Sequence, residues 1–193
     1  MSIQTQLFES ARLRLGPIDH EKDPAVESRW THDPCYQHGL GLDPARPLSP
    51  AQLKKKYEAI EKAIEESHNT FHFAVRGKDD DRLIGLARLE WIEWSHGAGH
   101  LKLAIGDPQD RRQGYGSEVM QLMLRFAFDE LNLYRLSVVV GEDNAAGLAL
   151  FKKFGFVEEV RRRQALTRNG QVFDLLHFGL LRSEWQPEEH SQP

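Results

Sequence analysis

The residues whose types and spacing most directly suggest chemistry form a glycine-containing loop between an apolar stretch and an amphipathic one. The apolar stretch ends at Leu103-Ala104-Ile105, and the loop follows it. A helix that begins after such a loop exposes backbone N–H groups without partners inside the helix, and an anion can accept their hydrogen bonds. Glycine lets the backbone approach that anion closely or adopt positive φ. The loop therefore predicts a phosphate site, built by Arg111, Arg112, Gln113, Gly114, Tyr115, Gly116 and Ser117.

The spacing within this loop distinguishes it from two other nucleotide motifs. A Walker loop needs Gly-x-x-x-x-Gly-Lys-Ser/Thr and a dinucleotide loop needs Gly-x-Gly-x-x-Gly, and neither pattern is present here. The pattern is instead Arg111-x-x-Gly114-x-Gly116. It resembles the coenzyme A pyrophosphate loop of the GNAT superfamily of acyl-CoA N-acyltransferases, and within it the ribosomal-protein-alanine and spermidine acetyltransferase branch. Further positions follow at that family's spacing: Asn144, Phe151 and Gly155-Phe156.

The resemblance implies a co-substrate and a way of holding it. The co-substrate would be acetyl-CoA, with its pyrophosphate in the loop and its pantetheine arm between strands four and five, which splay apart in that fold. Leu103, Ala104 and Ile105 would offer main-chain groups to the arm. Asn144 is either a helix N-cap, a side-chain contact of the pantetheine, or both. No metal is expected, since no residue set has metal-ligand spacing and the nine histidines are scattered.

Acetyl transfer to an amine requires a group that accepts the proton of an alkylammonium, whose pKa is near ~10. Two candidates lie on the strands before the loop, Glu90 and His100. In related sequences a glutamate often stands where His100 aligns, and either residue could instead be an ordinary strand side chain. The nearby Trp91 and Trp94 are candidates to wall an acceptor pocket or to pack on the sheet.

Phe151 departs from the family pattern, in which a tyrosine commonly occupies this position and protonates the departing thiolate. Phenylalanine has no proton to give. Two functions therefore remain open: an N-acetyltransferase that works without this hydroxyl, and an acyl-CoA-binding sensor or interaction domain with reduced or no catalysis. The acceptor of the enzyme would be a primary amine on a protein N-terminus, a polyamine or a small molecule.

The elements that must position these residues follow from periodicity and turn signals. Alternating and apolar runs predict strands at 12–15, 70–76, 82–94, 98–105, 135–140, 157–166 and 172–181. Helical periodicity and capping signals predict helices at 19–30, from 50 onward, at 115–131 and at 144–155. Residues 31–50 receive no assignment and are either a connector or an acceptor-site loop. The expected class is α/β (α+β), with a mixed, mostly antiparallel sheet of about seven strands flanked by helices.

Composition is that of an ordinary globular chain. The 193 residues fit a single domain, 1–193, with a core at about 10–183 and a disordered tail at 184–193. A net charge of −4 predicts no nucleic-acid partner, and the absence of a long apolar run predicts no membrane partner. The lone cysteine, Cys35, is expected to be a buried or half-buried apolar residue. A single cysteine cannot form an internal disulfide, and the sequence shows no targeting segment, so a cytoplasmic location is expected. A homodimer is left open.

Overall fold

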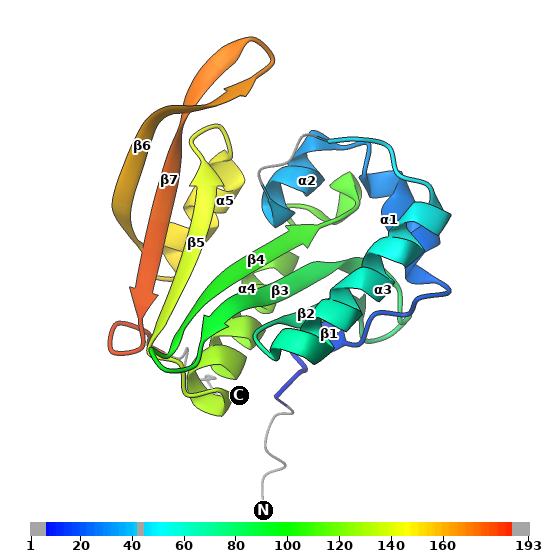
Figure 1. The fold of residues 1–193 in the computed structure, drawn as a ribbon, viewed down its shortest axis with the longest axis horizontal. Helices are drawn as coiled ribbons and strands as arrows, with labels where there is room; N and C mark the ends of the chain where they lie inside the picture. The colour runs from blue at the N-terminus through cyan, green and yellow to red at the C-terminus, as the bar shows by residue number, and fades with distance from the viewer. Residues whose placement is uncertain (1–6, 42–44, 187–193) are drawn as a thin grey trace, which may run out of the picture.

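The computed structural model describes residues 7–41 and 45–186. Its seven strands form one sheet in the order β1-β2-β3-β4-β5-β7-β6, in which β4 and β5 are parallel and every other neighbouring pair is antiparallel (Figure 1). This architecture confirms the predicted fold class. The strands are β1 (Leu13–Gly16), β2 (Phe71–Gly77), β3 (Leu83–Glu93), β4 (Ala98–Ile105), β5 (Arg135–Gly141), β6 (Val157–Arg168) and β7 (Gln171–Leu181).

Helices cover both faces of the sheet. They are α1 (Asp23–Trp30), α2 (Pro34–Leu40), α3 (Pro50–Ser67), α4 (Tyr115–Arg125) and α5 (Ala145–Lys153). Helices α1, α2 and α3 lie on one face, and α4 and α5 lie on the other (Figure 1). Helix α3 begins with the predicted capping box, in which Ser49 and Gln52 each bond the other's backbone N–H. None of the described helices is long and apolar enough to cross a lipid bilayer.

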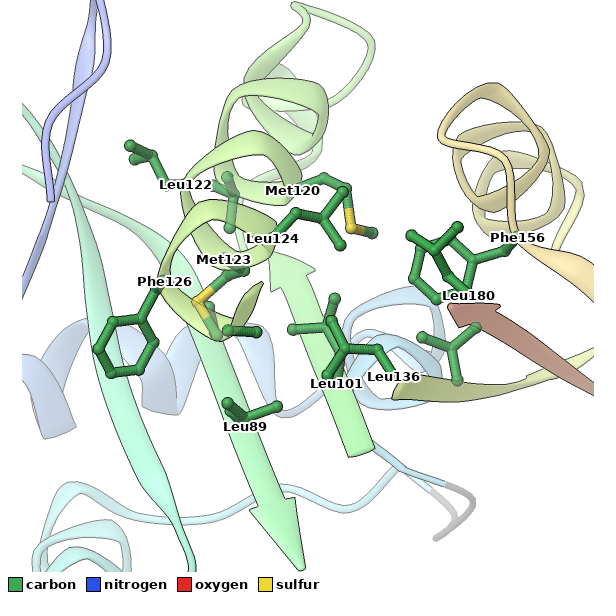
Figure 2. Packing of buried hydrophobic residues seen from close by; sticks show 14 of the residues in the cluster. Leu89, Leu101, Met120, Leu122, Met123, Leu124, Phe126, Leu136, Phe156 and Leu180 are labelled. Atoms are coloured by element: carbon green, nitrogen blue, oxygen red, sulfur yellow. The ribbon is translucent and has the colours of Figure 1, made fainter. Parts of the chain in front are cut away.

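The main core lies between α4 and the sheet. Met120, Met123 and Leu124 on α4 are fully buried and belong to one cluster with Leu101 of β4 and Leu136 of β5 (Figure 2). This packing confirms the apolar stripe predicted at 115–131. The helical run ends in a π-helical turn, η2 (Phe126–Glu130), so its regular α-helical part is shorter than predicted. The core thus holds α4, and with it the preceding glycine loop, firmly against the sheet.

Strands β4 and β5 pair only at their beginnings and then diverge (Figure 1). The parallel pairs join Ala98, Gly99 and His100 to residues 135–137. Beyond His100, β4 keeps its antiparallel partner β3 as far as Ile105 but has no partner on the β5 side. This divergence is the splay of strands four and five that the family resemblance implies. It opens the sheet beside the C-terminal half of β4.

Three local features differ from the sequence-based predictions. The unassigned segment contains helix α2, which begins after an Asp33 cap and has only seven residues, too few to show a helical period. Cys35 in its first turn is exposed, so the expected burial of this residue is wrong. The start of the predicted disordered tail is also misplaced, because Trp185 packs on Phe128 with ring centroids 5.3 Å apart. Residues 187–193 of that tail lie outside the described residues.

Candidate active site

A cavity of about 280 Å³ lies where β4 leaves β5. It brings together the end of α2, the diverging strands, α5 and the β6–β7 hairpin. Its lining residues include Trp91, His100, Lys102, Leu103, Asn144 and Phe151. Residues that the sequence places far apart, from α2 to β7, therefore share one site.

The glycine loop next to this cavity presents a run of unused donors. Within the described part of the chain, the backbone N–H groups of residues 112–116 make no hydrogen bond, whereas those of Ser117 and Glu118 donate to the carbonyl oxygen of Gly114. Gly114 is the N-cap of α4 and has φ +86°, a left-handed conformation that glycine adopts without strain. Unused N–H groups at a helix N-terminus suit a phosphate group. The local geometry thus fits the pyrophosphate of coenzyme A.

Arg111 holds the loop in place and does not offer a free charge. Its guanidinium donates to the carbonyl oxygens of Ile105 at 3.2 Å and Gly106 at 2.6 Å, and it forms an ion pair with Asp33 at 2.5 Å. Its backbone N–H donates to Pro108. These contacts tie the end of β4 to the loop and to the start of α2. These contacts give Arg111, one of the residues expected at the phosphate site, a structural role in this loop.

The cation that remains available in the loop is Arg112. Its side chain is exposed and makes no hydrogen bond or ion pair with any described residue. Lys153 at the end of α5 adds a second charge nearby, since its Nζ donates to Ser117 Oγ at 3.3 Å. Tyr115 is covered by the Arg12 guanidinium 4.6 Å from its ring centre, and Arg12 also donates to the carbonyl oxygen of Gln113 at 2.9 Å. A segment before β1 thus clamps the loop while Arg112 stays free.

The positions expected along the pantetheine arm are placed as follows. Leu103 lines the cavity. Ala104 is buried in a smaller apolar cluster that includes Trp30 and Tyr36, and the carbonyl oxygen of Ile105 already accepts a hydrogen bond from Arg111. Asn144 is the N-cap of α5, and its Oδ1 accepts a hydrogen bond from the Gly147 N–H at 2.9 Å. The predicted cap is confirmed. Asn144 also lines the cavity, which leaves its amide hydrogens able to donate to a bound arm.

The two candidate bases occupy paired positions on β3 and β4, but only His100 lines the cavity. Glu90 is 6% exposed and is held by two cations, Lys102 at 2.5 Å and Arg88 at 3.3 Å. A carboxylate fixed in this way orients its partners. The structure therefore favours His100 over Glu90 as the group that meets a substrate.

The protonation of His100 suits such a role. Burial lowers the pKa of its imidazole below the ordinary value, and the nearby Glu90 carboxylate opposes part of that shift. His100 is consequently neutral at pH 7 and has a free lone pair for a proton. The Trp91 ring lies with its centroid 5.2 Å from the imidazole and covers it on one side. Trp91 is 59% exposed, which excludes the sheet-packing interpretation of this residue.

Phe151 lines the cavity from α5, so it occupies the side expected for the family tyrosine. Its ring packs on Phe156 and Phe178, with centroids 5.7 and 6.4 Å away. Of the described residues that line the cavity, none carries a hydroxyl or a thiol. Nor do three His, Cys, Asp or Glu side chains gather anywhere in the described ranges as a metal site would require.

Several lining residues were missed in the sequence. His38 and Gly39 come from α2, and Lys102, Arg162 and His177 come from three different strands. His177 Nε2 is buried without a hydrogen-bond partner among the described residues. The single histidine in the apolar run of β7 was a signal that could have identified it. Arg161, the neighbour of Arg162 on β6, pairs instead with Glu158, Glu142 and Asp174 outside the cavity.

Comparison with known proteins agrees with this geometry. The family model described as "Acetyltransferase (GNAT) domain" matches residues 12–157. The chain is 31% identical over 142 residues to an N-acetyltransferase 9-like protein of Caenorhabditis briggsae, covering 65% of this chain and 71% of that protein. It is 27% identical over 176 residues to the uncharacterized N-acetyltransferase YoaA of Bacillus subtilis, covering 91% and 97%.

Similarity to solved structures supports the fold. A spermidine N-acetyltransferase from Vibrio cholerae, solved in complex with CoA and spermine, superposes with a TM-score of 0.77 at 22% identity, covering 91% of this chain and 98% of that one. Together with the family match over residues 12–157, the open sheet and the loop before α4 identify the chain as a member of the GNAT acetyltransferase family.

Proposed function

We propose that this protein transfers the acetyl group of acetyl-CoA to a primary amine in a ternary complex, without a covalent enzyme intermediate. The observation that carries the proposal is the row of unused N–H groups at residues 112–116, which lies beside the opening between β4 and β5. The unpaired side of β4 would pair with the pantetheine arm. Arg112 would add charge at the pyrophosphate.

The proposed chemistry takes place at His100. The bound thioester supplies an acyl carbon, and an amine that has lost its proton attacks that carbon. His100 Nδ1 or Nε2 accepts the proton directly or through one water, because its burial keeps the imidazole neutral. The C–N bond forms as the C–S bond breaks, and the electron pair of the C–S bond leaves on sulfur. The nitrogen then releases its second proton to water and becomes the amide. Glu90 positions Lys102 and the β3–β4 wall around this reaction.

The departing thiolate must be protonated without help from Phe151. A thiol has an ordinary pKa of ~8.5, so its anion leaves far more readily than an alkoxide and water can protonate it afterwards. Catalysis therefore remains feasible but loses the rate that a positioned acid supplies. The same observation favours the alternative function, an acyl-CoA sensor or interaction domain in which Phe151 marks lost catalysis.

The acceptor amine is a separate question. Relatives include a spermidine N(1)-acetyltransferase of Vibrio cholerae and an alpha/beta-tubulin-N-acetyltransferase 9 of Drosophila melanogaster. A polyamine, a protein N-terminus and a small amine are therefore all acceptors to test.

The deciding experiment is an amine screen with detection of the free thiol. We expect thiol release from acetyl-CoA that depends on both the protein and an amine. Tight binding of acetyl-CoA with no release above the rate without protein, across polyamines, peptides and small amines, would instead establish the sensor. The matched control is His100→Gln, which keeps the cofactor loop intact and should abolish most of the release.

A further inference from the structure

The described lining of the cavity carries two cationic side chains, Lys102 and Arg162. The charged and titratable side chains of this described lining are Lys102, Arg162 and the histidines 38, 100 and 177, and none of them is a carboxylate. A pocket for a polyamine needs negative groups to replace the water around each ammonium. This lining supplies the opposite charge.

The carboxylate of Glu90, behind one wall, does not cancel this charge. It contacts both Lys102 and Arg88, so one negative charge is shared between two positive ones. With a side-chain exposure of 26%, Lys102 remains partly open to a ligand. Its Nζ lies 5.0 Å from the Trp91 ring centre, on the wall that also carries His100.

The carboxylates near α2 and α5 are paired elsewhere. Asp33 is bound to Arg111 at 2.5 Å, and Asp143 is bound to Arg168 at 2.6 Å. The side chain of Arg162, by contrast, makes no hydrogen bond or ion pair with any described residue. It reaches the cavity from β6, opposite the wall that carries Lys102. Two cations thus face the acceptor space from separate strands.

This arrangement affects an amine in two ways. Nearby positive charge disfavours the ammonium form, so a bound amine loses its proton more easily and becomes nucleophilic. The same charge attracts an anionic group on the acceptor. Residues 100 and 102 of β4 lie on the same face of the strand, about 6.6 Å apart along it. A ligand whose amine and carboxylate are a few bonds apart can bridge this distance, with the amine bonded to one residue and the carboxylate to the other.

We infer that the acceptor is an amine that carries a carboxylate close to the amino group, with the carboxylate at Lys102 and Arg162 and the amine at His100. This inference rests on the proposed acetyltransferase function. Two sources share the chemistry: a free amino acid and a peptide whose first residue is acidic. A polyamine or a neutral amine has no carboxylate to bind Lys102 and Arg162.

The test compares matched acceptors with the wild-type protein. Aspartate is compared with its diamide, the peptide Asp-Ala-Ala-amide with Asn-Ala-Ala-amide, and both pairs with spermidine. We expect kcat/KM to be at least about tenfold higher for the acidic member of one pair, the effect of one favourable charge contact. An amine next to an amide is less basic than one next to a carboxylate, so a larger fraction of it is unprotonated and nucleophilic at neutral pH. Intrinsic reactivity alone would therefore favour the neutral member of each pair. Which pair shows the larger ratio identifies the source.

A charge reversal tests the residues themselves. Arg162→Glu should reduce the acidic preference about tenfold, because it removes one cation and adds a repulsive charge. Arg163→Glu is the matched control: it makes the same change one residue along β6, on a side chain that does not line the cavity, and should leave the ratio unchanged. Equal use of acidic and neutral acceptors would overturn the inference while leaving acetyl transfer intact. No acetylation of any amine would overturn the proposed function and the inference with it.

Discussion

Adjacent arginines in the glycine loop have different contacts, and this difference predicts opposite consequences of two alanine substitutions. Arg111 bonds two backbone carbonyls and Asp33, whereas the Arg112 side chain is exposed and makes no hydrogen bond or ion pair with a described residue. Arg111→Ala should therefore destabilise the fold, and Arg112→Ala should weaken coenzyme A binding in a protein of unchanged stability.

The magnitude for Arg111 follows from its partners. A hydrogen bond to a charged group is worth ~1.5–3 kcal/mol when shielded from water. The side chains of Arg111 and Asp33 are 25% and 26% exposed, so their ion pair is partly screened and contributes less than a buried one. We expect a loss of ~2–4 kcal/mol in the free energy of unfolding, or roughly 5–15 °C in Tm for a chain of this length.

The assay pairs thermal unfolding with calorimetric titration of coenzyme A. Arg112→Ala should leave Tm within experimental scatter and raise Kd by roughly 5–10-fold, the value of one exposed charge on a phosphate. Arg111→Ala, titrated well below its Tm, should lose affinity only as far as the loop is disturbed. An unchanged Tm in Arg111→Ala would refute the anchoring role, and an unchanged Kd in Arg112→Ala would refute the free-cation role.

Three further predictions concern single residues. Phe151→Tyr restores a hydroxyl at the cavity and should raise turnover, by up to about 10²-fold if the ring lies beside the sulfur; an unchanged rate and pH profile in an active enzyme would make Phe151 a packing residue only. For His100, whose pKa is lowered by burial, kcat should fall only at a pH below the ordinary histidine range of ~6.5, and this acid limb should vanish in His100→Gln; an unaltered profile would exclude it as the base. For His72 on β2, burial lowers the pKa to about 3, so below pH ~6.5 the unfolded chain binds a proton that the folded protein does not. The free energy of unfolding should therefore fall by ~2 kcal/mol between pH 6.5 and pH 5. Urea unfolding of His72→Gln should lack this pH dependence, and an equal dependence in the variant would contradict the reasoning.

Much of the fold could be predicted because its signals are local. The capping box at Ser49, the stripe on α4 and the cap at Asn144 each depend on a few neighbouring residues. Helix α2 could not be predicted in the same way, since its seven residues hold their place through contact with β4. There Gly39 lies so close to Ala104 that an added Cβ would come within 2.8 Å of the Ala104 Cβ.

The site was predictable only where it lies on one stretch of chain. The loop before α4 is contiguous, so its spacing identified it. The side of the cavity proposed for the acceptor is assembled from α2, β4, β6 and β7, and no spacing links His38 to Arg162 or His177. The contacts of Arg111 and Glu90 could not be predicted from the sequence either. Arg111 pairs with Asp33, which lies 78 residues away in the chain. Glu90 meets Lys102 only because of the register in which β3 pairs with β4.

The most direct test of the central claim follows the acetyl carbon itself. Acetyl-CoA labelled with carbon-13 at the carbonyl is mixed with the protein and with acidic, neutral and cationic amines, and NMR spectra are recorded over time. We predict that the thioester signal is replaced by an amide signal, at a rate proportional to the protein concentration and dependent on the amine. A thioester signal that persists, or that turns into free acetate whether or not an amine is present, would contradict the account.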